Sequence, residues 1–180
     1  MSSAARQREM EQGLLRMMQK RHYDEISVSD LCAEMEIPRK AFYRYFSGKD
    51  GALHSMIDHV LMDYDIHALS DTDDDNSALQ YMIYVFEYWT KQKELLDALA
   101  KSERSGLLVQ RAMVISNDLD VLPDFMQIRD QQRREYGTMF LVCGLMTMIV
   151  QWHHDGFGKS PREMAQLAMT LFTQPMFGAE

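Results

Sequence analysis

Cysteine and proline are both scarce in this chain of 180 residues, which has two cysteines and four prolines. The two cysteines, Cys32 and Cys143, lie far apart in apolar patterns and belong to no CxxC pair or cysteine–histidine cluster. This spacing argues against a disulfide framework and against a zinc knuckle. It fits a protein of the reducing cytoplasm.

Long apolar runs are missing as well. The longest covers residues 139–150, whereas a helix that crosses a membrane needs about 20 apolar residues. The first nine residues, Met-Ser-Ser-Ala-Ala-Arg-Gln-Arg-Glu, lack the apolar core of a secretory signal. We therefore expect a cytoplasmic protein without a membrane partner.

Positive charge is in short supply, because 19 Lys and Arg residues stand against 27 Asp and Glu residues, a net charge of −8. Such a balance at first opposes a nucleic-acid partner. The charge is uneven, however: residues 1–50 carry nine basic and eight acidic side chains (net +1), which leaves ten and 19 (net −9) for residues 51–180. Any site for an anion such as DNA is therefore expected in the first quarter of the chain.

Strand-like alternation of apolar and polar residues is almost absent. Apolar residues instead recur at the helical spacing i, i+3, i+4 and i+7, so we predict an all-α protein. The first helix ends near residues 21–24, and the capping-box sequence at residues 27–30 begins a short second helix through Met35. Further helices are predicted over residues 39–46, 51–68, 77–93, 94–101, 103–117, 124–154 and 161–173. The acidic stretch Asp71–Asp75 is expected to be a solvated loop.

The second and third predicted helices have the pattern of a helix-turn-helix: two short helices, a tight turn, and aromatic and basic residues concentrated on the second. Pro38 suits the first turn of that second helix because its φ is fixed. Phe42 and Phe46 are four residues apart, so we expect them to face inward together with Ile37.

The other face of the same helix is basic and aromatic, with two pairs of residues at i, i+4: Arg39 with Tyr43, and Lys40 with Arg44. Such a face suits the major groove of DNA, where Arg and Lys contact guanine edges and phosphates and Tyr contacts phosphates or thymine methyl groups. Ser27 and Ser29 lie at the start of the preceding helix, where free N–H groups favour a phosphate.

Residues 23–32 and 37–50 together resemble the DNA-binding module of TetR/AcrR-type transcriptional regulators. They read Tyr-Asp-Glu-Ile-Ser-Val-Ser-Asp-Leu-Cys and Ile-Pro-Arg-Lys-Ala-Phe-Tyr-Arg-Tyr-Phe-Ser-Gly-Lys-Asp. The Phe-Tyr-x-x-Phe-x-x-Lys core is the most specific part, and the resemblance covers about residues 8–55. The Ile-x-Arg-x-x-Phe-Tyr form is similar to the branch that includes dihydroxyacetone-kinase regulators.

The resemblance implies a role for each matching residue. Tyr43 matches the family tyrosine that contacts the DNA backbone or a thymine, and Lys49 matches the lysine that binds a phosphate at the start of the fourth helix. The variable base-reading and phosphate positions are those of Arg39, Lys40, Arg44 and Tyr45.

Three positions depart from the family pattern. Glu36 stands where the turn usually has glycine, Pro38 where the third helix usually has a small polar cap, and Ala41 where Thr or Ser is common. The carboxylate of Glu36 would either weaken DNA affinity by repulsion or point into solvent. These departures bear on affinity and sequence preference, and leave the class unchanged.

The resemblance divides the chain into a DNA-binding domain, residues 1–50, and an α-helical domain for ligand binding and dimerisation, residues 51–180. The predicted helix 124–154 has one apolar stripe on each of two faces, so one face suits its own core and the other a second subunit; burial of both in the monomer is the alternative. The stripes are Tyr136, Phe140, Cys143, Thr147 and Val150, and Met139, Val142, Met146 and Ile149. The last predicted helix, residues 161–173, has a further apolar stripe, formed by Met164, Leu167, Ala168, Leu171 and Phe172. A homodimer would read the two half-sites of a palindromic operator.

The resemblance also implies a small-molecule effector that releases the DNA from a repressor. The candidate pocket residues are aromatic or sulfur-containing, and the alternative for each is plain core. They are Tyr81, Tyr84, Tyr88, Trp89, Met113, Met139 and Cys143. We expect no metal and no other cofactor.

Two rival functions remain open. One is a helical interaction module that has lost tight DNA binding, which the acidic body and Glu36 would favour. The other is a small helical enzyme with a metal on His59, Asp63 and His67, although no His-Glu-x-x-His motif, Ser/His/Asp nucleophile motif or phosphate-binding glycine loop is present. We therefore expect a protein that is not an enzyme.

Overall fold

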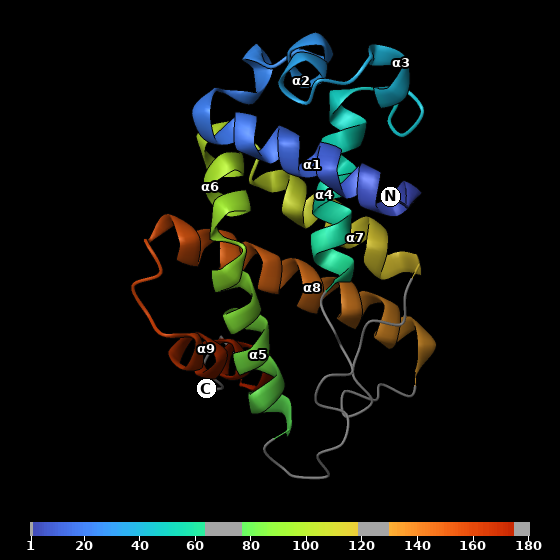
Figure 1. The fold of residues 1–180 in the computed structure, drawn as a ribbon. Helices are drawn as coiled ribbons and strands as arrows, with labels where there is room; N and C mark the ends of the chain where they lie inside the picture. Colours follow the sequence, from blue (N-terminus) through green and yellow to red (C-terminus); the bar gives the residue numbers. More distant parts are fainter. Residues whose placement is uncertain (1, 64–76, 119–129, 175–180) are drawn as a thin grey trace. The chain divides into compact units, whose positions relative to one another are not determined.

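The computed structural model describes residues 2–63, 77–118 and 130–174. These residues form nine α-helices and one 3-10 turn, and no strand occurs among them (Figure 1). The all-α prediction is therefore confirmed. None of the described helices is long and apolar enough to cross a membrane.

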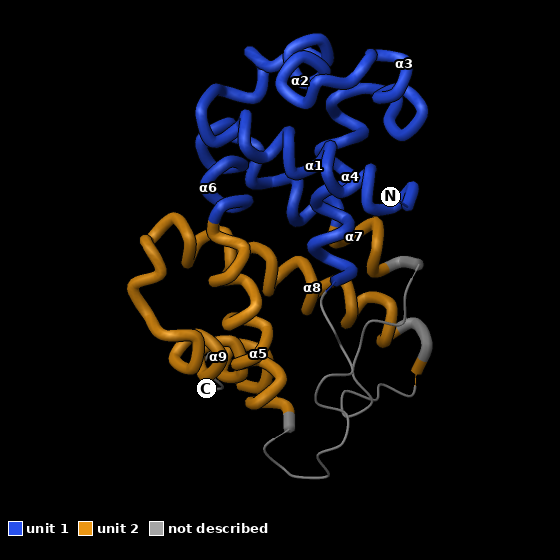
Figure 2. The backbone as a smooth tube through the Cα atoms, viewed as in Figure 1, with its two compact units in different colours: residues 1–63, 94–111 blue, residues 64–93, 112–180 orange. Residues whose placement is uncertain are grey.

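The chain divides into two compact units, shown in different colours in Figure 2. The first consists of residues 1–63 and 94–111, and the second of residues 64–93 and 112–180. Helix α7 (Gly106–Asp118) begins in the first unit and ends in the second.

The first unit contains α1 (Ser3–Lys20), the 3-10 turn η1 (Tyr23–Glu25), α2 (Val28–Glu34), α3 (Arg39–Phe42), α4 (Lys49–Met62) and α6 (Lys93–Lys101). Helix α1 packs on α4 and α2, and α2 packs on α3. The core is built from apolar side chains at helical spacing, which are Met10, Leu14, Met18, Leu31, Leu53, Ile57, Leu96 and Leu99. Burial of these side chains fixes the short helix α2 on the longer ones.

A buried carboxylate ties α1 to α4. Glu11 is 2% exposed, accepts a hydrogen bond of 2.7 Å from Ser55 Oγ, and lies 2.7 Å from Nδ1 of His59. A buried carboxylate needs such partners because its desolvation is costly. At the surface, Arg8 makes a second link between the two helices through two hydrogen bonds to Asp63, of 2.8 and 2.9 Å.

The second unit contains α5 (Ser77–Lys91), α8 (Gln131–His154) and α9 (Pro161–Thr173), with α5 packed on α9. Its core includes Met82, Phe86, Ile149, Trp152, Ala165 and Ala168. Trp152 contacts Phe86 and Phe157 edge to face, with ring centroids 5.4 and 4.6 Å apart. These aromatic contacts hold the turn between α8 and α9 against α5.

Three helices end in the same left-handed cap. After α2, α6 and α8 the residues in the left-handed region are Glu36 (φ 52°), Glu103 (φ 54°) and Gly156 (φ 70°). In each case the next N–H bonds to a carbonyl five residues back, as from Ile37 to Cys32. This is the Schellman motif, whose left-handed position usually carries glycine.

The helix boundaries differ from the predicted ones where local hydrogen bonding decides them. The third helix, predicted through Phe46, ends at Phe42, because the carbonyl of Phe42 accepts from the N–H groups of both Tyr45 and Phe46 in a tighter turn. The fourth begins at Lys49 rather than Gly51 and ends at Met62. Its predicted extension to residue 68, the acidic stretch 71–75 and the predicted helix start at residue 124 lie outside the described residues.

Candidate nucleic-acid interface

The helix-turn-helix begins with the capping box that the sequence predicted. The N–H of Asp30 donates to Ser27 Oγ (3.1 Å), and the Asp30 carboxylate accepts from the N–H (2.8 Å) and the hydroxyl (2.7 Å) of Ser27. These hydrogen bonds hold the pKa of Asp30 below its usual value. The hydroxyl of Ser27 is therefore engaged within the protein, while Ser29 in the same turn is exposed.

Three apolar side chains anchor α3, as predicted. Phe42, Phe46 and Ile37 are buried, and the rings of Phe42 and Phe46 are 5.3 Å apart between centroids. An α-helix of four residues is not stable by itself in water, because so short a helix cannot offset the cost of its nucleation. The aromatic anchor therefore fixes the orientation of the helix and of everything on its outer face.

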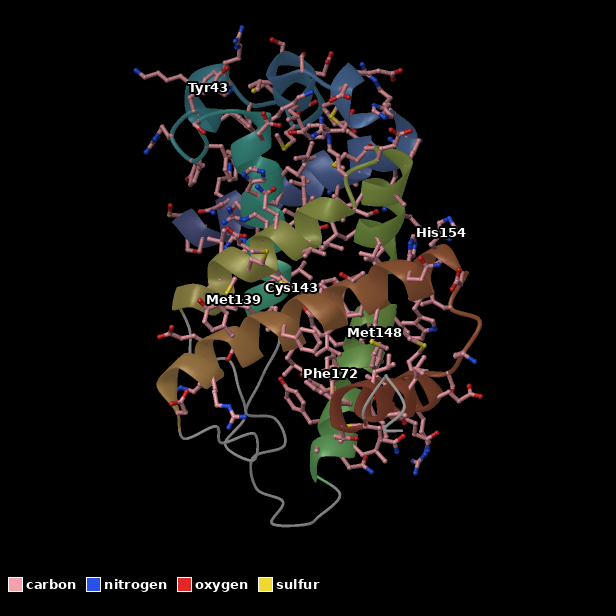
Figure 3. All side chains as sticks on the ribbon, turned by 180° about the vertical axis from the view of Figure 1, so that it is seen from behind. Tyr43, Met139, Cys143, Met148, His154 and Phe172 are labelled. Carbon is pink, nitrogen blue, oxygen red and sulfur yellow. The ribbon has the colours of Figure 1, made fainter. Side chains whose placement is uncertain are left out.

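The outer face of α3, together with the turn that follows it at residues 43–45, carries the predicted cations and tyrosine. Arg39, Lys40 and Arg44 are exposed, Tyr43 is 48% exposed, and Figure 3 shows Tyr43 at the surface of the first unit. Arg39 Nη2 donates to the Tyr43 hydroxyl at 3.4 Å, and its guanidinium carbon lies 5.8 Å from the Tyr43 ring centroid. The two side chains thus form one exposed, positively charged surface.

The remaining two candidates, Tyr45 and Lys49, are half-buried. Tyr45 contacts the anchor, with its ring centroid 6.4 Å from that of Phe46. Lys49 Nζ donates to the backbone carbonyl of Tyr23 at 2.8 Å and lies 4.3 Å from the Tyr23 ring centroid. The ammonium has three N–H groups, so this bond leaves donors for a phosphate and limits where the side chain can go.

Sequence reasoning missed the cluster that surrounds Lys49. Tyr23 is fully buried, and its hydroxyl donates to Asp50 at 2.5 Å. Burial, together with that hydrogen bond, raises the pKa of the Tyr23 phenol, so the tyrosine stays neutral. Arg104, on the turn between α6 and α7, stacks on the same ring at 4.4 Å. Because Arg104 is about 80 residues away in sequence, no local pattern could have revealed this contact.

Acidic side chains border the basic surface. Glu36, at the position of the usual turn glycine, is exposed on the turn before α3, and Asp50 is exposed beside Lys49. Glu36 has a left-handed backbone, which glycine adopts without strain and glutamate does not. The departure from the family pattern therefore has both a conformational and an electrostatic consequence.

The histidine and aspartate residues considered for an enzyme serve structural contacts where they are described. His59 bonds to the buried Glu11, and Asp63 pairs with Arg8; His67 lies outside the described residues. In the described part of the chain, no group of three or more His, Cys, Asp or Glu side chains is arranged to hold a metal ion.

The candidate effector residues lie in the second unit. Tyr81 and Trp89 are buried in the α5 core, Tyr84, Tyr88, Met139 and Cys143 are half-buried, and Met113 is 37% exposed. Figure 3 shows Met139 and Cys143 along α8. The seven predicted residues therefore differ in their access to solvent: two are buried, four are half-buried and one is exposed.

The two predicted apolar stripes of α8 differ in burial. Met146 and Ile149 are buried, whereas Tyr136 and Phe140 are 68% and 64% exposed. On α9, Leu167 and Leu171 are 40% and 37% exposed while Met164 and Ala168 are buried. The helices meet at Phe140 and Phe172, whose ring centroids are 6.1 Å apart. In the described part of the chain, each of the two helices thus has exposed apolar side chains on one face.

Comparison with known proteins gives two family matches that together cover most of the chain. Residues 13–56 match the family described as "Bacterial regulatory proteins, tetR family", and residues 76–174 match "Transcriptional regulator C-terminal region" of the same group. No curated protein sequence matches the chain.

Among solved structures, the "Dihydroxyacetone kinase operon activator DhaS" has a similar fold, with a TM-score of 0.54 and 15% sequence identity over 92% of this chain and 93% of that chain. At this identity the likeness is one of fold. The helix-turn-helix geometry and the two family matches lead to one conclusion: the chain belongs to the tetR family of DNA-binding transcriptional regulators.

Proposed function

We propose that this regulator is a homodimeric repressor that reads a palindromic operator with α3 and leaves the DNA when a small molecule binds its larger domain. The observation that carries the proposal is the outer face of α3 and of the turn after it, where Arg39, Lys40, Tyr43 and Arg44 are all exposed above a buried aromatic anchor. A rigid helix with such a face fits a major groove. We assign DNA binding to residues 1–50, and effector binding and dimerisation to residues 51–180.

The exposed residues divide into two roles. Arg39 and Arg44 are proposed to read base edges, since their guanidinium groups can make paired hydrogen bonds to guanine. Lys40, Tyr43, Tyr45 and Lys49 are proposed to bind the sugar-phosphate backbone and so to set the register on the duplex. Ser29 would donate to a phosphate, while Ser27 would act through the capping box that orders the first turn of α2.

Dimerisation is proposed through the uncovered apolar faces of α8 and α9. The exposed aromatic side chains Tyr136 and Phe140, with Leu167 and Leu171, supply the apolar area that an isologous interface requires. A dimer would place two copies of α3 at successive half-sites, about one turn of DNA apart.

The effector is proposed to bind in the second unit, among the seven aromatic, methionine and cysteine side chains named above. Flexible methionines and half-buried aromatic rings suit an adaptable apolar site. Ligand binding would favour a conformation whose spacing between the two α3 helices no longer matches the operator.

The similar solved structure bears the name of an activator, so activation is the alternative outcome of DNA binding. The Ile-x-Arg-x-x-Phe-Tyr motif at residues 37–43 carries the proposal that the chain falls in the dihydroxyacetone-kinase-regulator branch.

The experiment that tests this function is selection of sheared genomic DNA by the purified full-length protein at about 0.15 M salt, near physiological screening. Enrichment of one palindromic site by the wild type, and its loss with Tyr43→Ala, is the expected result. The exposed variant Gln110→Ala on α7 serves as a matched control that should enrich the same site.

Absence of enrichment with effector-free protein would contradict the proposal. It would instead favour the helical interaction module, which keeps the fold without tight DNA binding and for which the exposed Glu36 and the acidic second unit are the supporting observations. Protein refolded from denaturant, which removes a co-purified ligand, distinguishes this outcome from release by a bound effector.

A further inference from the structure

Lys49 is held in place from a part of the chain that lies far from the helix-turn-helix in sequence. The turn between α6 and α7 contains Ser102, Glu103 and Arg104, with Glu103 in the left-handed region (φ 54°). That backbone directs the residues on both sides of Glu103 onto η1. Ser102 is 3% exposed, and its Oγ accepts a hydrogen bond of 3.1 Å from the N–H of Tyr23.

Arg104 makes the second set of contacts from the same turn. Its guanidinium carbon lies 4.4 Å from the Tyr23 ring centroid, and its Nη2 donates to Asp24 Oδ1 at 2.6 Å. Its Nε is buried and finds no hydrogen-bond partner within the described part of the chain. Burial of an unpaired N–H is unfavourable. The stacking on Tyr23 and the pairing with Asp24 offset this cost, and these two contacts therefore determine the position of the Arg104 side chain.

Tyr23 in turn contacts both residues at the start of α4. Its backbone carbonyl accepts from Lys49 Nζ at 2.8 Å, its ring lies 4.3 Å from the same ammonium, and its hydroxyl donates to Asp50 at 2.5 Å. A lysine that is already confined loses less conformational freedom when it meets a phosphate. The turn between α6 and α7 therefore reaches Lys49 through a single buried residue, Tyr23.

We propose that Arg104 is a positioning residue for DNA binding, which acts through Tyr23 to hold the ammonium of Lys49 where it meets a backbone phosphate. The inference rests on the proposed function, in which Lys49 binds that phosphate. Arg104 itself contacts no DNA in this arrangement, because its guanidinium is engaged with the ring and with Asp24.

The test is the salt dependence of binding of the full-length protein to the selected operator duplex. Each phosphate contact contributes about 0.9 to the slope of log Kobs against log salt and about fivefold in affinity at 0.15 M salt. Lys49→Ala should lose one such contact. Arg104→Gln should lose most of the same slope and affinity, and the double variant should lose no more than Lys49→Ala alone. Arg104→Lys, which restores a cation for the ring and for Asp24, should recover most of the loss.

Arg111→Gln is the matched control. Arg111 is another guanidinium of the first unit, held by Asp58 at 2.7 and 2.6 Å, and its replacement removes the same charge without touching Tyr23. It should leave the slope unchanged. Thermal unfolding of every variant checks that the fold is retained.

Asp24→Ala keeps the inference testable if Arg104→Gln does not fold. Asp24 is 63% exposed on its side chain, so its removal should be tolerated. Loss of an acidic charge by itself would strengthen DNA binding, whereas loss of the anchor for Arg104 should weaken it and lower the slope.

Three results would overturn the inference: an unchanged slope for Arg104→Gln, tighter binding by Asp24→Ala, or additive losses in the double variant, which would make Arg104 a direct phosphate contact. A wild-type protein that binds no duplex specifically would instead refute the proposed function, and the positioning role with it.

Discussion

At the scale of single residues, Glu36 shows a conflict between local conformation and residue type. It occupies the left-handed position of the cap after α2, with φ 52°, and lies exposed on the turn that leads into α3. A side chain with a β-carbon costs roughly 1–2 kcal/mol in this region. Glycine avoids that cost but has more conformational freedom to lose from the unfolded chain.

Glu36→Gly should therefore raise the free energy of unfolding by about 0.5–1 kcal/mol, the difference between these two effects. For a chain of this size that corresponds to an increase in Tm of about 1–4 °C, measurable by thermal unfolding. Glu36→Ala, which removes the charge but keeps the β-carbon, should show no such increase. Equal gains in the two variants would mean that charge rather than backbone strain is responsible.

At the scale of elements, two capping boxes set the starts of α2 and α9. In each, a serine caps the helix and an acidic residue three positions later bonds back: Ser27 with Asp30, and Ser160 with Glu163. The hydrogen bonds from the serine hold the pKa of Asp30 and of Glu163 below their usual values. Arg8 lowers the pKa of Asp63 in the same way at the end of α4.

A carboxylate whose pKa is lowered by folding stabilises the fold at pH values above its pKa in the unfolded chain, which is near 4. This stabilisation is lost as the pH falls through the lowered pKa of the folded state. Urea unfolding should therefore show a midpoint that is steady above about pH 5 and falls below about pH 4. The double variant Ser27→Ala/Ser160→Ala should be less stable at neutral pH, by about 1 kcal/mol for each cap, and should lose less on acidification. Parallel pH curves for variant and wild type would contradict this origin of the acid sensitivity.

Helices and caps were predictable from the sequence because their causes are local. The 3.6-residue period marked the helices, the Ser27–Asp30 spacing marked the start of α2, and the Phe42–Phe46 spacing marked the anchor of α3. The early end of α3 and the early start of α4 were not predictable, because they depend on which carbonyls are satisfied in the turn at residues 43–48. The contacts of Lys49 with Tyr23, and of Tyr23 with Arg104, come from packing between distant segments, which no local pattern encodes.

At the scale of the whole molecule, the uncovered apolar faces of α8 and α9 predict a dimer of two 21.0 kDa chains. Phe140→Glu combined with Leu171→Glu should dissociate it, because each would place a charge in a buried apolar interface. Sedimentation at micromolar concentration should then give a monomer for this variant. Gln110→Glu, which adds one charge at an exposed position of α7, should remain dimeric. A wild-type monomer would contradict the predicted dimer, and a dimeric double variant would place the interface elsewhere.

The central claim is that α3 and the turn after it read DNA sequence. The most direct measurement is the ratio of affinities for the selected operator and for a scrambled duplex of equal length, both at the same salt concentration. Specific regulators typically favour their site by about 10³-fold or more, and we predict a ratio in that range for the wild type. Arg44→Ala should lower the ratio by about 10- to 100-fold, the typical discrimination of a good base contact, with little change in affinity for the scrambled duplex. Lys49→Ala should weaken binding to both duplexes alike. A wild-type ratio near one, or identical behaviour of the two variants, would contradict sequence reading by α3.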